Sequence, residues 1–311
     1  MMNAVLLLFA VAAPPPESPP LGGQDGVTYA VALSPDGKTL VTGGKDGTLI
    51  LWDVAGRFET KRVAAHEGPI LALAFAADGS AVVTGGADKT VRLWDAKEAK
   101  EKQPALQAHD DAVTAVAVNA DASLIASAGW DGKVKICDSK GAAMGEHTLH
   151  KGPVFSVAFS PDGKVVASGG RDRTVQLWDV AGKKKQAAVE ELGRTVFAVA
   201  FLPDNQLVTA AGDLVKVWDA KTLQPKAELK GHLAAVRSLA VGGKGKTLAS
   251  AGEDGHVRLW DVGKLALRDD IDADAGIVTA VSLSDDGATL AAATADRTRS
   301  VRTWKLPPAK E

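Results

Sequence analysis

Histidine, serine or threonine, and aspartate recur in this 311-residue chain at spacings that could support catalysis. One such set occurs three times with the same order and spacing: His66, Thr84, Asp88; His150, Ser168, Asp172; and His232, Ser250, Asp254. A histidine beside an aspartate can act as a general acid or base. A catalytic set, however, would not recur with the period of the fold. The sequence therefore favours a structural role for these residues and predicts no catalytic residue.

Other motifs of enzyme or metal chemistry are missing from the sequence. It contains no HExxH, no GxSxG, no CxxC and no glycine-rich phosphate loop followed by Lys-Ser/Thr. Carboxylates such as Asp36, Asp78 and Asp162 recur in turns, where aspartate stabilises its own backbone. We therefore expect a protein that is not an enzyme and has no cofactor and no metal site.

Composition excludes several classes of protein. The formal net charge is -2, and no basic cluster of the kind that binds nucleic acid is present. Cys137 is the single cysteine, so no intramolecular disulfide can form. A hydrophobic fraction of 46% and 32 glycines describe a globular chain with a large core.

Trp-Asp pairs mark an internal repeat. Their tryptophans are Trp52, Trp94, Trp178, Trp218 and Trp260, and Trp304 follows at the end. A unit is missing between Trp94 and Trp178, and placing it at Cys137 gives steps of 42, 43, 41, 40, 42 and 44 residues. Trp130, in AGWDG, lies only 36 residues after Trp94 and is out of register. The degenerate pair Cys137-Asp138 is therefore the third repeat's equivalent of Trp-Asp.

Each repeat contains the same pattern of strands. An alternating apolar segment such as YAVALSPDG ends in a turn, a second segment such as VTGGKDG ends in a tight turn with Asp, and a third resembles TLILWD. The polar link that follows is long enough for a fourth strand. The pattern predicts an all-β fold.

In these residues the chain resembles the WD-repeat (WD40-type) family over about nine tenths of its length. The resemblance implies a seven-bladed β-propeller of four-stranded antiparallel blades. We assign the propeller to residues 22–306, with a proline-rich segment at 14–21 and a C-terminal tail at 307–311.

The resemblance also implies a hydrogen-bond chain in each blade, from a histidine before the first strand through Ser or Thr and Asp to the tryptophan. Such a chain satisfies a buried indole N–H and a buried carboxylate. Three blades have the full set: His66, Thr84, Asp88, Trp94; His150, Ser168, Asp172, Trp178; and His232, Ser250, Asp254, Trp260. The departures are Gln24, Leu192 and Asp274 at the histidine position, Cys137 at the tryptophan position and Ala292 at the serine position.

The N-terminus is the one place where the sequence suggests targeting. Residues 4–13 are a ten-residue apolar run, too short to span a bilayer. We predict a signal peptide in residues 1–13, with cleavage after Ala12 and export to the periplasm or the outside of the cell. A retained membrane-surface anchor and a misassigned start codon are alternatives. The family's closing strand for blade seven is expected from residues 17–23, or from VLLLFAV if that run is not a signal peptide.

A recognition surface remains as the functional candidate. In the family, the residue before the tight-turn Asp and a residue at the start of the first strand face one rim of the channel. Here the first set is Lys45, Ala87, Trp130, Arg171, Gly212, Glu253 and Ala295, and the second is Tyr29, Leu71, Thr114, Phe155, Phe197, Arg237 and Thr279. Aromatic residues and arginine are typical of binding hot spots. The predicted partner-binding residues are Trp130, Phe155, Arg171 and Phe197, with Tyr29, Lys45 and Arg237.

These observations predict a monomeric, non-catalytic scaffold that binds protein or peptide partners, with no nucleic acid and no membrane span. Phe155 and Phe197 could instead pack between neighbouring blades. The alternative function is a propeller hydrolase, or an accessory subunit of an enzyme complex, with a ligand in the channel. A channel enzyme should place converging acidic residues on the rim, and only Glu253 is acidic there.

Overall fold

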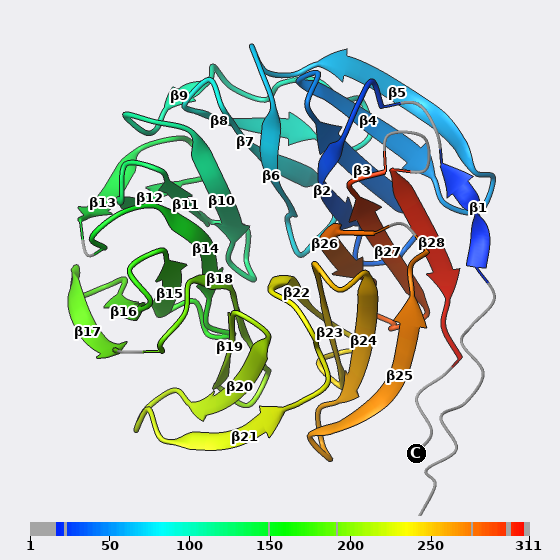
Figure 1. Ribbon diagram of the computed structural model, residues 1–311. Helices are drawn as coiled ribbons and strands as arrows, with labels where there is room; N and C mark the ends of the chain where they lie inside the picture. Colours follow the sequence, from blue (N-terminus) through cyan, green and yellow to red (C-terminus); the bar gives the residue numbers. More distant parts are fainter. Residues whose placement is uncertain are drawn as a thin grey trace, which may run out of the picture.

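Seven four-stranded antiparallel sheets surround a central axis in the computed structural model of this chain (Figure 1). The structure describes residues 17–21, 24–148, 150–190, 192–274, 276–296 and 300–307. All regular secondary structure in these residues is β-strand. The predicted all-β, seven-bladed propeller is confirmed.

Each blade uses its four strands in the same order from the channel outward. The innermost strands are β2 (Thr28–Leu33), β6 (Ile70–Phe75), β10 (Val113–Val118), β14 (Val154–Phe159), β18 (Val196–Phe201), β22 (Val236–Gly242) and β26 (Val278–Leu283). The second strands are β3 (Thr39–Gly44), β7 (Ala81–Gly86), β11 (Leu124–Gly129), β15 (Val165–Gly170), β19 (Gln206–Ala211), β23 (Thr247–Gly252) and β27 (Thr289–Thr294). The third strands are β4 (Thr48–Asp53), β8 (Thr90–Asp95), β12 (Val134–Asp138), β16 (Val175–Asp179), β20 (Leu214–Asp219), β24 (His256–Asp261) and β28 (Val301–Lys305). The outermost strands are β5 (Phe58–Ala64), β9 (Leu106–Gln107), β13 (Ala143–His147), β17 (Lys184–Val189), β21 (Pro225–Leu229), β25 (Ala266–Asp272) and, for blade seven, β1 (Glu17–Leu21).

Burial is greatest in the second strand of each blade and least in the fourth. All residues of β7 and β23 are buried, whereas β5 is exposed along almost its whole length. The second strands are rich in Ala, Gly and Val because neighbouring blades approach them closely. A Cβ atom on Gly85 would lie 2.6 Å from Cγ1 of Val113 in the next blade. Small residues at these positions therefore allow the blades to pack face to face.

The hydrophobic core consists of clusters between neighbouring blades. In the cluster between blades one and two, Trp94 packs with Leu49, Leu51 and Ile70. Tryptophans occupy the equivalent place in five further clusters. In the cluster between blades two and three, this place is taken by the smaller Cys137. The repeat register with Cys137 as the structural position therefore holds in three dimensions.

The ring is closed by β1, which pairs antiparallel with β28 through Ser18 opposite Thr303 and Leu21 opposite Val301. Blade seven therefore takes its fourth strand from the N-terminal side of the chain, within the expected residues 17–23, so the propeller begins at residue 17 and not at 22. The run VLLLFAV and the predicted signal peptide lie outside the described residues, as do residues 308–311 of the tail.

Candidate partner-binding rim

The first-strand rim residues owe their orientation to a β-bulge that recurs in each blade. The ladder between first and second strands shifts register at one residue, for example between Thr28 and Ala30, which leaves Tyr29 unpaired. A bulge bends the strand and re-aims the bulged side chain. The bulged residues are those predicted from the sequence: Tyr29, Leu71, Thr114, Phe155, Phe197, Arg237 and Thr279.

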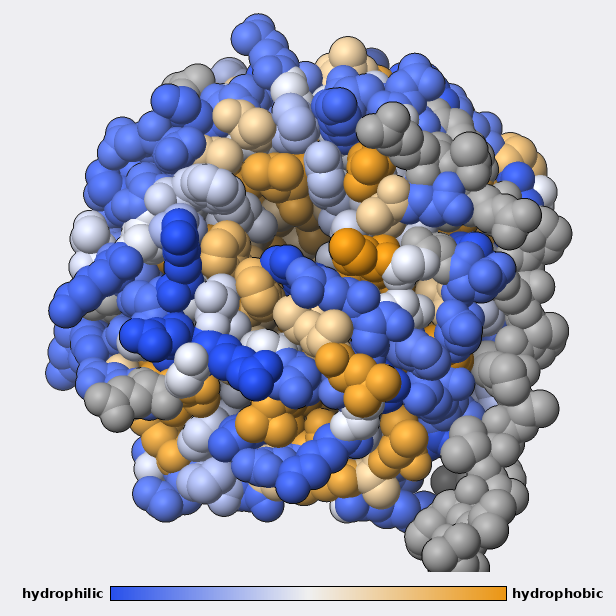
Figure 2. All heavy atoms as spheres, viewed as in Figure 1, coloured by the Kyte–Doolittle hydropathy of each residue, from blue (hydrophilic) through white to orange (hydrophobic). Residues whose placement is uncertain are grey.

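All seven bulged residues line one central cavity of about 330 Å³. The face seen in Figure 2 is hollowed at its centre, and hydrophobic residues border the hollow. Not all of the seven side chains are available to a partner. The Thr279 hydroxyl donates to the carbonyl oxygen of Thr28 in the neighbouring blade at 3.0 Å. The Thr114 hydroxyl lies 3.1 Å from the carbonyl oxygen of Ala128 in its own blade and also contacts that of Val154 in the next blade. These two threonines hold the inner strands in place.

Phe155, Phe197 and Arg237 form a contact group across blades four, five and six. The two phenylalanine rings are 5.4 Å apart between centroids. The guanidinium of Arg237 lies over the Phe197 ring, 3.9 Å from its centroid. Both rings are half-buried and border the cavity, so they pack across the blade boundary and still present an edge to the channel. The packing and binding interpretations of these residues are therefore compatible.

Arg237 also joins the two predicted rim sets. Its Nε donates to Oε1 of Glu253, the residue before the tight-turn aspartate in blade six, at 2.9 Å. The only acidic residue of the predicted rim is thus held in an ion pair.

The tight-turn residues lie at the same end of the propeller, because the start of each first strand pairs with the end of the second, as Thr28 does with Gly44. Trp130 is 52% exposed, and its amide donates to the carbonyl oxygen of Ala112 at 3.0 Å. The turn is thereby fixed to the loop before the first strand, and the indole projects into solvent. Lys45 and Arg171 are exposed, and neither forms an ion pair with another described residue. Ala87, Gly212 and Ala295 present little or no side chain there.

Two exposed apolar residues near this end were not predicted. Leu233 is 87% exposed and follows His232, and Ile277, just before β26, is 43% exposed. The residue after the histidine in the other blades is charged, namely Glu67, Asp110 or Lys151. In blade six the amide at this position still donates to Asp254 at 3.0 Å, so leucine is not needed for the turn. A leucine at a position that is charged in the other three blades with a histidine was the signal that could have identified it.

The histidine sets lie inside the blades, away from the channel. Nδ1 of His66 lies 2.8 Å from Oδ1 of Asp88, and its Nε2 lies 2.6 Å from the hydroxyl of Thr84, which also accepts the indole N–H of Trp94 at 3.0 Å. Thr84 is fully buried. Burial lowers the pKa of His66 and outweighs the opposing effect of Asp88, so the imidazole is neutral. A buried hydroxyl between two fixed partners serves the framework.

Blade six has the same chain with an added cation. His232 Nε2 lies 2.7 Å from the hydroxyl of Ser250, and Trp260 donates to that hydroxyl at 2.8 Å. Burial opposes ionisation of Asp254, but hydrogen bonds from Arg258 and from the Leu233 amide outweigh it and lower the pKa of the carboxyl to about 2.

Blades one and four depart from the predicted chain in different ways. Gln24 replaces histidine with its amide: Nε2 donates to Asp46 at 2.9 Å, and Oε1 accepts from Thr42 at 3.0 Å. In blade four, His150 contacts Ser168 and Asp172, but no hydrogen bond among the described residues joins the indole of Trp178 to Ser168. Its ring stacks instead on His147 from blade three.

Blade seven keeps its tryptophan but lacks the predicted hydrogen-bond chain. Ala292 cannot accept the N–H of Trp304, yet Trp304 is buried with Val257 and Leu259 of blade six. Arg302, also buried, donates to the carbonyl oxygen of Asp274 at 2.7 Å. Packing between blades therefore holds this tryptophan where the hydrogen-bond partner is lacking.

Two further properties bear on function. In the part of the chain that the structure describes, no three His, Cys, Asp or Glu side chains gather in a way that could hold a metal ion. The same residues contain no helix with the length and apolar character needed to cross a bilayer.

Two family models match the chain. Residues 27–205 match the model described as IFT122 first beta-propeller, and residues 223–261 match the model described as WD domain, G-beta repeat. The first match covers more than half of the chain.

Matches to curated proteins are short. The chain is 52% identical over 42 residues to the NAD(+) hydrolase ApTIR of Actinoplanes sp., which is 14% of this chain and 6% of that protein. It is 51% identical over 35 residues to the small ribosomal subunit protein RACK1 of Glycine max, 11% of each chain. It is 56% identical over 34 residues to RACK1y of Oryza sativa subsp. japonica, 11% of this chain and 10% of that one. These alignments span about a tenth or less of the relatives' length, close to a single repeat.

Proposed function

Because the chain belongs to the WD-repeat β-propellers, the family described by the IFT122 first beta-propeller model, we propose that it is a non-catalytic scaffold that binds protein or peptide partners on its rim. The observation that carries the proposal is the exposure of Trp130 on a turn that is fixed to the neighbouring loop. An exposed indole on a rigid turn gives large contact area with little loss of conformational entropy on binding.

The charge of the rim supports a partner segment that carries carboxylates. Lys45 and Arg171 project from the same end as Trp130, and both lack an ion-pair partner among the described residues. Glu253 is neutralised by Arg237. Long-range attraction of an acidic segment to the two free cations would increase the association rate at low salt. Leu233 adds an apolar contact at the same end of the propeller.

The experiment compares two exposed aromatic residues. Phe58 is 56% exposed and pairs with Asp53 at the end of the blade opposite the tight turn. We expect the proteins that the native chain captures from its own source to be lost with Trp130→Ala and retained with Phe58→Ala. We also expect Arg171→Glu to capture less than the native chain, with a difference that grows as the salt concentration is lowered. Equal capture by native protein and both alanine variants would refute the rim as the binding site.

We also propose that the protein is exported. The predicted cleavage after Ala12 would leave the closing strand β1 intact, since that strand begins at Glu17. Mass determination of the mature N-terminus checks this directly: a chain that begins at residue 13 supports export, and an intact residue 1 contradicts it.

A further inference from the structure

The space between blades two and three lacks the indole that fills the other blade boundaries. Between blades one and two, the ring of Trp94 packs on Leu49 and Leu51. The equivalent position of blade three holds Cys137, which contacts the cluster containing Val91. A thiol occupies far less volume than an indole, and the wall residue Val91 is no larger than its counterpart Leu49 between blades one and two.

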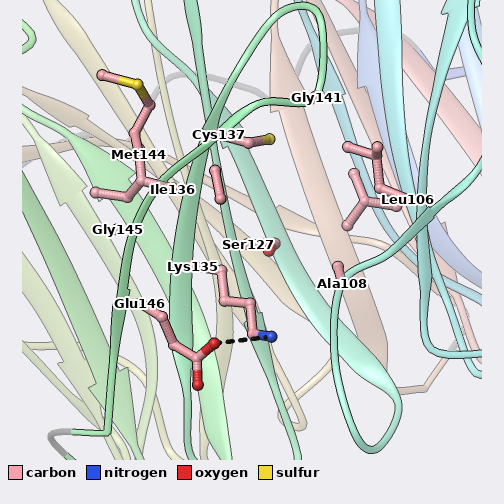
Figure 3. Close-up of a pocket in the computed structure, with 12 residues that line it drawn as sticks. Leu106, Ala108, Ser127, Lys135, Ile136, Cys137, Gly141, Met144, Gly145 and Glu146 are labelled. Atoms are coloured by element: carbon pink, nitrogen blue, oxygen red, sulfur yellow. Dashed lines mark ion pairs between the residues drawn. The ribbon is translucent and has the colours of Figure 1, made fainter.

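A pocket of about 420 Å³ lies at this place (Figure 3). Blade two contributes Val91, Leu106 and Ala108 to its wall, and blade three contributes Ser127, Cys137 and Met144. Binding pockets for small organic groups have about 300–1,000 Å³, and an apolar cavity of about 150 Å³ already admits benzene. The pocket therefore has room for an indole and for part of the chain that would carry it.

A single hydrogen-bond acceptor lies where the indole N–H belongs. In blades two and six the equivalent hydroxyls, of Thr84 and Ser250, accept the N–H of their tryptophans at 3.0 and 2.8 Å. The buried Ser127 hydroxyl retains its histidine, with Nε2 of His109 at 2.9 Å, borders the pocket, and has no second hydrogen bond to a described residue. Figure 3 shows this oxygen between Cys137 and Ala108 within the pocket.

The pocket opens to the circumference of the propeller. The outermost strand of blade two, β9, has two residues, whereas the outermost strands of the other blades have five to seven. The short strand leaves the outer side of this blade boundary less covered. Met144, 39% exposed, lies beside the opening on β13, and Lys135 and Glu146 form an ion pair at 3.1 Å within the lining.

We propose that this side pocket binds the tryptophan side chain of a peptide partner, with the indole N–H donating to the Ser127 hydroxyl and the ring packed against Val91, Leu106 and Cys137. The protein itself supports this choice of ligand, because it buries an indole at the same place in the other six blades. The volume beyond the ring accommodates peptide backbone, and Lys135 and Glu146 offer polar groups to its amides. The site is separate from the rim and does not depend on the proposed rim function.

The ligand test uses N-acetyl-L-tryptophanamide, its 1-methylindole analogue and N-acetyl-L-leucinamide, each titrated into the full chain and followed by ligand-observed NMR. We expect the tryptophan compound to bind, the methylated ring to bind about tenfold more weakly because it has no N–H to donate, and the leucine compound to bind least. Failure of the tryptophan compound to bind, or equal binding of all three, would overturn the proposal. Free indole is titrated in parallel, and its binding without binding of the tryptophan compound would overturn a peptide as the ligand.

A matched pair of variants locates the site. Cys137→Trp places an indole where six blades already have one, and should fold, raise the melting temperature and abolish binding. Leu267→Trp adds the same side chain at the exposed start of β25, in blade six, and should leave binding intact. Retained binding in Cys137→Trp, with its melting temperature at or above that of the native chain, contradicts the assignment.

Discussion

Nδ1 of His109 lies 3.0 Å from Oδ1 of Asp131, the same histidine–aspartate pairing as in blades two, four and six, which retain both their histidine and their tryptophan. Blade three therefore keeps the histidine, serine and aspartate of the chain although Cys137 replaces the indole. The His–Ser–Asp hydrogen bonds can therefore form without the tryptophan. Matched substitutions can measure how much each contributes to the free energy of unfolding.

Ser250→Ala should destabilise the protein more than Ser127→Ala. The first leaves both the N–H of Trp260 and Nε2 of His232 without a partner, whereas the second affects only His109. A buried polar group left unpaired costs about 1–3 kcal/mol, so the two variants should differ by about that amount. Urea unfolding of both variants checks this, and equal losses would show that the indole hydrogen bond contributes nothing.

Cys137 should react slowly with alkylating agents. Burial raises the pKa of its thiol to about 11, so little thiolate exists at neutral pH. We expect iodoacetamide to modify the native protein about 100-fold more slowly than the denatured protein at pH 8, since two pKa units reduce the thiolate fraction by about that factor. Mass spectrometry gives both rates unambiguously, because the chain has one cysteine. Equal rates would contradict a protonated thiol.

Stability should fall as the pH is lowered from about 6.5 toward 4. Burial lowers the pKa of His147 to about 4, and Nε2 has no partner among the described residues. The unfolded state, with an ordinary histidine pKa near 6.5, therefore binds more protons in this window, and protonation favours unfolding. His147→Phe should reduce the slope of unfolding free energy against pH between these values. Asp254, with a pKa of about 2, stays ionised in the folded protein, and protonation of the same carboxylate in the unfolded state adds to the loss only at the low end of this window, near pH 4.

Leu21→Ala should show how much the closing strand contributes. Leu21 is buried in the cluster that contains Trp52 and Val301, and large-to-small changes in such sites cost about 2–5 kcal/mol. Leu233→Ala, at a leucine that is 87% exposed, is the matched control and should change stability by less than about 0.5 kcal/mol. Chemical denaturation of the two variants provides the comparison, and similar losses would mean that β1 is not part of the stable ring.

The architecture could be predicted from the sequence because the repeat is periodic. The 40- to 44-residue steps identify Cys137 as the third structural position, and the bulged rim residues follow from the same register. Periodicity reports what the blades share, and it is informative even where one blade has lost its marker residue.

Contacts that occur in only one blade were harder to predict from the sequence. Gln24 looked like a defect at a histidine position, yet a carboxamide offers a donor and an acceptor in the same arrangement as neutral imidazole. The stacking of His147 on Trp178 joins two blades, and no residue that recurs in the repeats indicates this contact. The sequence indicated that Cys137 removes aromatic area, but whether its neighbours collapse into that space is decided by backbone packing.

The pairing of β1 with β28 places the seam of the ring between the two ends of the chain. Blades one to six are each built from consecutive strands and can form as the chain emerges during synthesis. Blade seven can be completed only after β28 has been released, with β1 waiting unpaired until then. The β1–β28 pairing is therefore the last part of the ring to form, and the ring stays open for as long as β28 has not been released.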